Sequence, residues 1–359
     1  MNILHICSIS NNKTSGVSNV VPEHLKHQKK YINVALLNCN KERNELLKEE
    51  DNVYYLDEVK SINNLPKPFN NPDLVIFHSY YIIEFKKIYK YLIKNKIPYV
   101  IIPHGAFDYR AQNQKKLKKV LGNILLFDKF YKNAIAIQYL SIDEQKNSKR
   151  FKKKSFVIGN GVNIPKKTKT KFSKNGLKLL YIGRYSIYTK GLDIIIDFAN
   201  ENKEELIKNN IIIDFYGTGA DGIEKVKELV KYKNVSNIIN VNGPIFGEEK
   251  EKVILDHDMF IQLSRHEGQP LGIMEAMSYG LPVIVSEGTT FGDIVKDNKC
   301  GIKYYNNEDL LTKLKKIINN VDSVNSLSTN SYYYVKKKLA WSIVSKVAIN
   351  NYKSVGDIK

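Results

Sequence analysis

Residues 259–285 read MFIQLSRHEGQPLGIMEAMSYGLPVIV, and this stretch decides the fold. Met259 to Leu263 form an apolar run typical of a buried strand, and Pro282 to Val285 form a second one. Between them the pattern becomes helical and ends near Gly280. The order of strand, loop, helix and strand predicts a βαβ unit in a parallel sheet.

Two glutamates, Glu267 and Glu275, lie in the connection of this unit. We expect the first in the loop after the carboxyl end of a strand and the second on the helix behind it. Ligands bind at that edge of open α/β sheets, and carboxylates there accept hydrogen bonds from a polyhydroxylated ligand. The alternative is a surface loop before an amphipathic helix with one exposed acid. Small and turn-forming residues around the acids argue against it, namely Gly268, Pro270, Gly272, Ala276 and Ser278.

The run from Arg265 to Met277 resembles the E-x7-E signature of the retaining glycosyltransferases of family 4, also called glycosyltransferase group 1. The similarity is almost continuous from Asp258 to Val285. Shorter matches extend it over most of the chain, at Gly16, His104-Gly105, Gly161-Val162-Asn163, Gly183-Arg184 and Lys190-Gly191. The resemblance implies a GT-B fold, which is an α/β fold of two Rossmann-like, doubly wound domains facing a cleft. It also implies a C-terminal helix that crosses back to the first domain.

Apolar runs alternate with helical patterns along all 359 residues, a length that accommodates two domains. The expected strands of the first half are 2–7, 33–37, 53–56, 74–78, 99–103 and 134–138, and residues 156–158 end this half. Those of the second half are 178–183, 211–216, 238–241, 259–263, 283–285 and 301–304. A helix is expected over 332–352, with the only tryptophan, Trp341.

We predict an N-terminal domain over 1–160 and a C-terminal domain over 177–335. The segment 161–176 is polar and turn-rich and is interpreted as a linker, and 336–359 is expected to pack back on the first domain. By resemblance, the first domain binds the acceptor and the second binds a nucleotide sugar.

The composition, with 43% hydrophobic residues, is that of a globular protein. No stretch approaches the roughly 20 apolar residues of a membrane-spanning helix, no secretory signal is evident, and the three cysteines indicate neither a disulfide framework nor a metal site. We therefore expect a cytoplasmic protein without a cofactor.

The net charge of +19 is concentrated in residues 86–154, which hold 18 Lys or Arg against four acids. Within it, the segment 110–132 mixes Lys115, Lys116, Lys118 and Lys119 with apolar residues, as in a basic helix that lies on an anionic membrane. An ordinary helix with a solvated basic face is the alternative. Under the first interpretation the protein is peripheral on the inner face of the cell membrane.

Arg184 and Lys190 flank the start of a predicted helix after the first strand of the second domain. Cations at a helix N-terminus form an anion site. The resemblance assigns this pair to the donor diphosphate, places His104 near the transferred sugar, and gives Glu267 the sugar and Glu275 the ribose. Arg184, Lys190, Glu267 and His104 are therefore the catalytic candidates. His5 and His78, also near strand ends, are secondary candidates.

The other donor-binding candidates follow strands or surround the two glutamates. They are Gly16, Gly217, Ile245, Gly268, Gln269, Pro270, Leu271 and Gly272. The loop at Gly16 has Ser15 where many family members have a second glycine, so a plain turn remains an alternative there. The loops at Gly217 and Ile245 are equally consistent with contact to the nucleotide base and with simple βα turns.

Asp256-His257-Asp258 resembles a D-x-D metal motif. It precedes a strand, so we expect it at the sheet edge opposite the cleft and predict no metal.

The sequence thus predicts a retaining hexosyltransferase that moves a sugar from a nucleoside-diphosphate donor, a UDP-sugar by family prior, to a glycan or lipid-linked glycan in cell-surface polysaccharide synthesis. A nucleotide-sugar epimerase or a phosphorylase on the same fold is one alternative. A basic nucleic-acid-binding protein is the other, but no recognised binding motif accompanies the charge.

Overall fold

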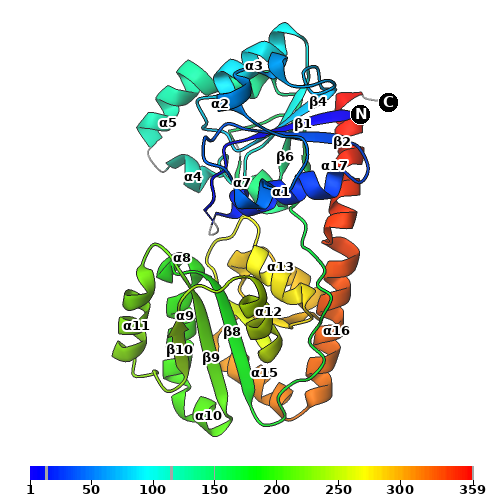
Figure 1. Ribbon diagram of the computed structural model, residues 1–359. Coiled ribbons are helices and arrows are strands. Elements are labelled where there is room, and N and C mark those ends of the chain that lie inside the picture. The colour runs from blue at the N-terminus through cyan, green and yellow to red at the C-terminus, as the bar shows by residue number, and fades with distance from the viewer. Residues whose placement is uncertain (13–14, 114–115, 149, 358–359) are drawn as a thin grey trace. The chain divides into compact units, whose positions relative to one another are not determined.

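The computed structural model describes residues 1–12, 15–113, 116–148 and 150–357. The chain divides into two compact units. The first comprises Met1–Gly161 and Trp341–Lys359, and the second comprises Val162–Ala340. Each unit has its own parallel sheet with helices on both faces (Figure 1). The predicted fold of two doubly wound α/β domains is confirmed.

The first unit is built on a seven-stranded sheet in the order β3-β2-β1-β4-β5-β6-β7. All neighbouring strands are parallel. The strands are β1 (Asn2–Cys7), β2 (Asn33–Asn38), β3 (Val53–Tyr55), β4 (Leu74–His78), β5 (Tyr99–Ile102), β6 (Ala136–Tyr139) and β7 (Ser155–Val157). Each predicted strand of this half is present, with ends shifted by at most two residues.

Side chains on alternate positions of these strands pack on opposite faces of the sheet. On one face, Phe77 and Tyr99 pack with Phe130 of α6 (Asp128–Asn133) and with α3 (Phe85–Lys94). The other face carries α1 (Gly16–Gln28) and α17 (Trp341–Gly356), which lie side by side although they come from opposite ends of the chain (Figure 1). The predicted return of the C-terminal helix to the first domain is therefore confirmed.

The remaining helices of the first unit are short. They are η1 (Glu45–Leu47), α2 (Leu56–Val59), η2 (Ile62–Asn64), α4 (Tyr109–Asn113), α5 (Lys116–Gly122), η3 (Asn123–Phe127) and α7 (Ile142–Asn147).

The second unit is built on a six-stranded parallel sheet in the order β10-β9-β8-β11-β12-β13. The strands are β8 (Leu177–Arg184), β9 (Ile211–Thr218), β10 (Ile239–Asn242), β11 (Met259–Gln262), β12 (Val283–Val285) and β13 (Gly301–Lys303). The βαβ unit expected from residues 259–285 is β11, α13 (Leu271–Ser278) and β12.

Two separate apolar clusters cover the faces of this sheet, and neighbouring residues of β8 contribute to different ones: Leu179 belongs to the first and Leu180 to the second. The first cluster includes α9 (Leu192–Glu201), α10 (Lys203–Lys208), α11 (Gly222–Tyr232) and α15 (Asn307–Ile318). The second includes α12 (Gly247–Asp256), α13, α14 (Gly292–Asp297) and α16 (Val321–Lys338). The short helices α8 (Ile187–Lys190) and η4 (Glu287–Thr289) lie in connections.

The helix predicted over 332–352 is two helices, α16 and α17, with a break at Leu339 and Ala340. The backbone N–H of Val162 donates to the carbonyl of Leu339 at 2.9 Å, and Val162 forms a β-bridge with Ala340. A helical sequence pattern does not predict this pairing with a distant segment. The chain also passes from the second unit to the first at this break.

The strand order reverses direction between β1 and β4 in the first sheet and between β8 and β11 in the second. Such a switch point leaves a crevice at the carboxyl ends of the strands, where ligands bind in doubly wound sheets. The loops that follow these four strands are therefore the places to look for a site.

Candidate functional site

The second sheet brings three of the four catalytic candidates to its switch point. Arg184 is the last residue of β8, Lys190 ends the short helix α8 that follows it, and Glu267 lies in the connection from β11 to α13. β8 and β11 are neighbours in the sheet. The carboxyl ends of two adjacent strands thus supply both cations and the acid.

Glu267 is the centre of this cluster. The side chains of Lys190, Gln262 and Ser264 all donate to its Oε1 atom, the Gln262 amide at 2.7 Å and the Ser264 hydroxyl at 2.9 Å. The side chains of Glu267 and Lys190 are 11% and 18% exposed. No described residue donates to Oε2, so this oxygen is oriented and can accept hydrogen bonds from a ligand.

The loop that carries Lys190 is fastened to the loop that carries Glu267. The Arg265 backbone N–H donates to the Thr189 carbonyl at 3.0 Å. The Arg265 guanidinium donates to the Tyr188 carbonyl at 2.7 Å and to the Asp193 carboxylate at 2.8 Å. It also lies over the Tyr188 ring. Because these bonds cross from one loop to the other, the ammonium and the carboxylate are held at a fixed separation.

Glycines are needed at two positions of this edge. Gly191 has φ +67, and a Cβ on it would lie 2.0 Å from the Leu263 carbonyl oxygen. Gly219 has φ +139, and its Cβ would lie 2.3 Å from Cγ of Arg184. The Arg184 side chain therefore passes over Gly219, while Gly191 lets the Lys190 loop contact the end of β11.

Glu275 lies on α13, one helix behind the loop, and its Oε2 accepts from Lys250 Nζ at 2.5 Å. Gly268, Gln269 and Pro270 lead into this helix, and Leu271 and Gly272 form its first turn. A Cβ on Gly272 would lie 3.2 Å from the carbonyl of Ile182 in β8. The glycine thus lets the start of the helix pack closely against the end of β8, next to Arg184.

The two predicted base-contact positions differ in setting. Gly217 pairs with Gly183 across β9 and β8, and a Cβ on Gly217 would lie 1.9 Å from the Gly183 carbonyl oxygen. Sheet packing alone therefore requires this glycine. Ile245 follows β10 and is buried.

The carboxylates of the Asp256-His257-Asp258 run are engaged by protein groups at the amino end of β11. Asp258 is buried and accepts from the backbone N–H groups of Ser173 and Lys178, each at 2.9 Å. Asp256 accepts from Lys178 Nζ at 2.8 Å. Over the described ranges, no group of three or more His, Cys, Asp and Glu residues is arranged to hold a metal ion.

In the first unit, His104 follows β5 in an unusual backbone conformation. Its φ is +48, a region that non-glycine residues rarely occupy and that clusters at functional sites. The next residue, Gly105, has φ +82, and its N–H donates to Oε1 of the buried Glu144 at 2.6 Å. The other carboxylate oxygen of Glu144 accepts from the Leu140 N–H at 2.7 Å. A buried acid thus holds the turn that presents His104.

His104 is also the end of a chain of buried histidines. Its Nε2 lies 3.0 Å from Nδ1 of His78, whose Nε2 lies 2.8 Å from Nδ1 of His5. His5 Nε2 is in turn 3.0 Å from Oε1 of Gln28, and His24 lies 3.4 Å from the Gln28 amide nitrogen.

Burial lowers the pKa of every ring in this chain. The pKa of His5 is lowered to about 4 and those of His24 and His104 to about 3. The pKa of His78 is also lowered, first by burial and then by the neighbouring His5 ring. All four rings are therefore neutral at pH 7.

Gly16 is the first residue of α1, after the carboxyl end of β1, and Ser15 caps the helix by accepting from the Ser18 N–H at 3.3 Å. The sequence left a plain turn as the alternative at this loop, and the cap accounts for Ser15 without a ligand.

Sequence reasoning missed Gln262, Ser264 and Arg265, which orient Glu267 and Lys190. Gln262 gave one signal, since it is a polar residue at the end of an apolar strand. It also missed the connection between His5, His78 and His104, although it had marked all three. Their sequence separations of 73 and 26 residues conceal the contacts.

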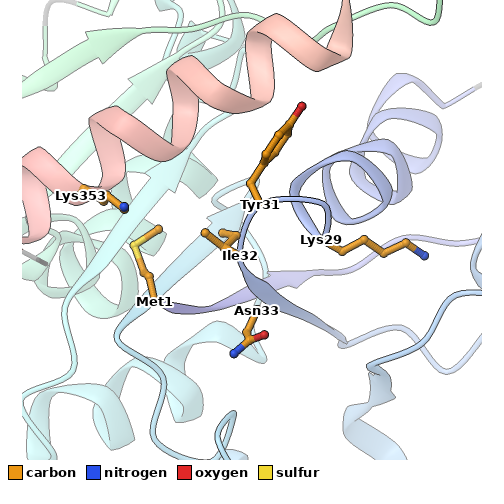
Figure 2. Close-up of a pocket in the computed structure, with 6 residues that line it drawn as sticks. All are labelled: Met1, Lys29, Tyr31, Ile32, Asn33 and Lys353. Atoms are coloured by element: carbon orange, nitrogen blue, oxygen red, sulfur yellow. The ribbon is translucent and has the colours of Figure 1, made fainter.

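A pocket of the first unit lies at the amino ends of its strands, opposite the edge that carries His104 and Gly16 (Figure 2). Met1 and Asn33, which line it, stand at the amino ends of β1 and β2, and Tyr31 and Lys353 of α17 line it as well. His104 and Gly16 follow the carboxyl ends of strands, so this pocket is separate from the candidate site.

The predicted membrane segment 110–132 is described in part. Lys115 and the side chains of Lys116 and Lys118 lie outside the described residues. Lys119 donates to the Ala111 carbonyl and lies 5.4 Å from the Tyr81 ring centroid. Tyr109 and Leu121 are exposed by 50% and 60%. No described helix has the length and apolar character needed to cross a membrane.

Residues 163–333 match the family model described as "Glycosyl transferases group 1". The chain is 28% identical over 137 residues to the poly(ribitol-phosphate) alpha-N-acetylglucosaminyltransferase of Staphylococcus aureus, covering 37% of this chain and 26% of the relative. It is 33% identical over 114 residues to the alpha-monoglucosyldiacylglycerol synthase of Acholeplasma laidlawii, covering 31% and 29%. The matches thus span less than a third of either relative.

Protein CapJ of Staphylococcus aureus is 30% identical over 245 residues, or 64% of this chain and 58% of the relative. Among solved structures, Anabaena Alr3699/HepE in complex with UDP aligns with a TM-score of 0.74 at 14% identity, covering 99% of this chain and 100% of that one. The lipopolysaccharide outer core galactosyltransferase WaaB aligns with a TM-score of 0.69 at 17% identity and 99% coverage of both chains. The structural likeness concerns the fold.

Proposed function

We propose, from the premise that this chain belongs to the glycosyl transferases group 1 family, that it is a retaining hexosyltransferase with a UDP-sugar donor. The observation that carries the proposal is the pairing of Lys190 with Glu267 at the switch point of the second sheet, with Arg184 at the end of the adjacent strand β8. A lysine held on an oriented carboxylate, with an exposed arginine at the end of the neighbouring strand, matches a ligand with a diphosphate at one end and sugar hydroxyls at the other.

In this proposal Arg184 and Lys190 bind the donor diphosphate and stabilise the negative charge that develops on the leaving phosphate. Arg184 contributes a planar fork of donors, while Lys190 acts as a point charge. Two cations supply the neutralisation that a divalent metal gives in other transferases, so the proposed reaction is metal-independent.

Glu267 accepts hydrogen bonds from the sugar through Oε2, because Oε1 is occupied by three protein donors. Glu275 binds the ribose hydroxyls, with Lys250 as its protein partner. His104 of the first unit hydrogen-bonds a hydroxyl of the transferred sugar. Gly16, Gly217, Ile245 and residues 268–272 complete the proposed donor contacts, with the second unit binding the nucleotide sugar and the first binding the acceptor.

The choice of UDP is supported by the solved complexes of Anabaena Alr3699/HepE with UDP and with UDP-glucose. The name of one relative refers to poly(ribitol-phosphate), and the name of another gives a monoglucosyldiacylglycerol as the product of the synthase. We propose a glycan or lipid-linked glycan of the cell surface, modified at the cytoplasmic face of the membrane. The exposed Tyr109 and Leu121 and the basic residues of segment 110–132 provide the membrane contact.

A ligand panel followed by one variant tests the proposal. UDP and UDP-glucose are expected to raise the melting temperature more than ADP, GDP or their sugars. Glu267→Gln preserves the size of the side chain and is expected to lower kcat/KM roughly 100-fold or more, as loss of one preorganised polar contact does. The control is Glu228→Gln on the exposed side of α11. Turnover of Glu267→Gln at the level of the control contradicts the assignment, and conversion of UDP-glucose to another nucleotide sugar without acceptor identifies an epimerase.

A further inference from the structure

The histidine chain behind His104 continues through the first unit to the C-terminal helix. Tyr352 of α17 donates its hydroxyl to Oε1 of Gln138 at 2.7 Å, and the Gln138 amide nitrogen donates to the Ile158 carbonyl at 2.9 Å. Burial raises the pKa of Tyr352, and a hydrogen bond from Gln28 opposes that rise. The Tyr352 hydroxyl already donates its single proton to Gln138, so Tyr352 accepts in its contact with Gln28 and the amide N–H of Gln28 donates.

These contacts fix which atom donates in every hydrogen bond of the histidine chain. A backbone carbonyl can only accept, so the Gln138 nitrogen faces Ile158 and its oxygen faces Tyr352. Gln28 then gives its nitrogen to Tyr352, which leaves its oxygen for His5. The second N–H of Gln28 faces Nδ1 of His24, and Nε2 of His24 lies 3.3 Å from Oδ1 of Asn160, so this branch agrees with the same amide orientation.

The tautomers follow from the amide orientation because each ring is neutral and carries one proton. The Gln28 oxygen accepts from His5 Nε2–H, so Nδ1 of His5 is an acceptor and takes Nε2–H of His78. Nδ1 of His78 likewise takes Nε2–H of His104. The remaining atom, Nδ1 of His104, carries a lone pair, and no described residue donates to it.

We propose that His5 and His78, oriented by Gln28 and Tyr352, are positioning residues that hold His104 as the neutral Nε2–H tautomer with Nδ1 as a hydrogen-bond acceptor. The ligand group that fits this acceptor is a hydroxyl that donates its proton, not a carbonyl or a carboxylate. This inference rests on the proposed function, because it names the chemistry that His104 presents to the sugar. It also gives the buried polar residues of β1 and β4 a role that sheet packing does not require.

The tautomer can be measured directly and without a ligand. In protein labelled with ¹⁵N-histidine, two-bond ¹H–¹⁵N correlation spectra distinguish the two neutral tautomers and the cation. The signals of His104 are assigned by their loss in His104→Gln. We expect a single neutral Nε2–H form from pH 7 down to pH 5. A Nδ1–H form, a mixture of tautomers, or a charged ring at pH 6 overturns the proposal.

A matched pair of variants tests the positioning role. Asn and Leu have similar shapes, but only Asn offers an oxygen near the position of the His78 Nδ1 atom, and both remove the contact with His5 equally. His78→Asn is therefore expected to keep His104 in one tautomer and to retain most of kcat/KM. His78→Leu is expected to give a mixed or mobile His104 ring and to lower kcat/KM about tenfold, with the affinity for UDP unchanged in both.

The outcomes separate this inference from the proposed function. The assay follows UDP release from UDP-glucose, and calorimetry follows UDP binding. If the wild type binds no UDP, the proposed function fails, and the NMR spectra still decide the tautomer. If UDP binds and the Asn and Leu variants have equal turnover and equal His104 spectra, the positioning role is wrong while the function stands. If a His78 variant loses its melting transition, Tyr352→Phe is measured in its place. Tyr99→Phe is the control, since the Tyr99 hydroxyl makes a buried hydrogen bond to Phe130 that is not part of the histidine chain.

Discussion

The two units of the chain carry candidate residues of opposite chemistry, a charged half in the second unit and a neutral half in the first. In the second unit, the loops after β8 and β11 hold charged groups, with Lys190 donating to Glu267, and Arg184 ends β8. In the first unit, the turn after β5 presents His104, and every ring behind it is neutral because burial lowers its pKa. A charged edge suits a diphosphate, whereas a neutral, hydrogen-bonding edge suits hydroxyls.

The two halves also differ in how their geometry is enforced. Arg265 fastens one loop of the charged half to the other through contacts with Tyr188, Thr189 and Asp193. The neutral half depends on a hydrogen-bonded chain that begins on α17, far from His104 in sequence. The Arg265 contacts fix the distance between Lys190 and Glu267, and the hydrogen-bonded histidine chain fixes which ring nitrogen of His104 carries the proton.

The largest expected effect follows from removing a cation of the charged half. Lys190→Met keeps the apolar stem and deletes the ammonium, so the charge on the leaving phosphate loses a stabilising partner. We expect kcat/KM for UDP-sugar turnover to fall roughly 100- to 1,000-fold. The control is Lys178→Met, which breaks the ion pair with Asp256 at the other edge of the sheet. Equal activity of the two variants contradicts the assignment of charge to this edge.

A second prediction concerns the loop that places Lys190. In Gly191→Ala, the left-handed φ of +67 costs roughly 1–2 kcal/mol, and the new Cβ would lie 2.0 Å from the Leu263 oxygen, so the loop must move. We expect a loss of more than about 2 kcal/mol in unfolding free energy, together with a fall in kcat/KM. Gly222→Ala is the matched control, because Gly222 has φ +76 but nothing within 4 Å of a Cβ. It isolates the backbone cost, and urea unfolding of the two proteins measures the difference.

The sequence predicted the charged half more completely than the neutral half, and the reason is physical. Glu267, Glu275, Arg184 and Lys190 lie directly after or behind apolar strands, so strand order alone brings them to one edge. The fold followed from the same alternation, and every predicted strand is present. Local patterns do not encode contacts between distant residues, which is why the Gln28–His5–His78 chain and the break at Leu339 were not predicted.

A third prediction uses the neutral half. The pKa values of His5, His24 and His104 in the folded state lie below the ordinary value of 6.5, so the unfolded chain binds protons first as the pH falls. Stability is fully present above pH 6.5 and is lost toward pH 4. Between pH 6.5 and 5 each of these rings contributes a loss of roughly 2 kcal/mol at most.

The only tryptophan, Trp341, lies with its ring centroid 4.8 Å from that of His24, so its fluorescence reports the unfolding of the first unit. Urea unfolding at pH 7, 6 and 5 measures how the unfolding free energy changes with pH, and His24→Gln is expected to make this change smaller. A first unit whose stability is independent of pH in this range shows that the rings are not held neutral, and the comparison of a charged with a neutral half then loses its basis.

The smallest expected effect concerns the exposed apolar residues of segment 110–132. Leu121 is 60% exposed on α5, and its insertion among lipid chains would remove its apolar surface from water. Leu121→Asp removes part of that gain and is expected to weaken binding to vesicles of phosphatidylglycerol and phosphatidylcholine about three- to tenfold. Ile207→Asp is the control, since Ile207 is 47% exposed on α10 of the second unit.

Vesicle sedimentation at low and high salt separates the apolar contribution from the basic one, because only the attraction of lysines to anionic lipid is screened. UDP binding is expected to be the same in both variants, since neither residue is among the proposed donor contacts. If Leu121→Asp and Ile207→Asp sediment equally with vesicles, segment 110–132 has an ordinary solvated basic face. The membrane contact would then belong to another part of the chain, and the first unit would keep only its neutral hydrogen-bonding edge as a distinguishing feature.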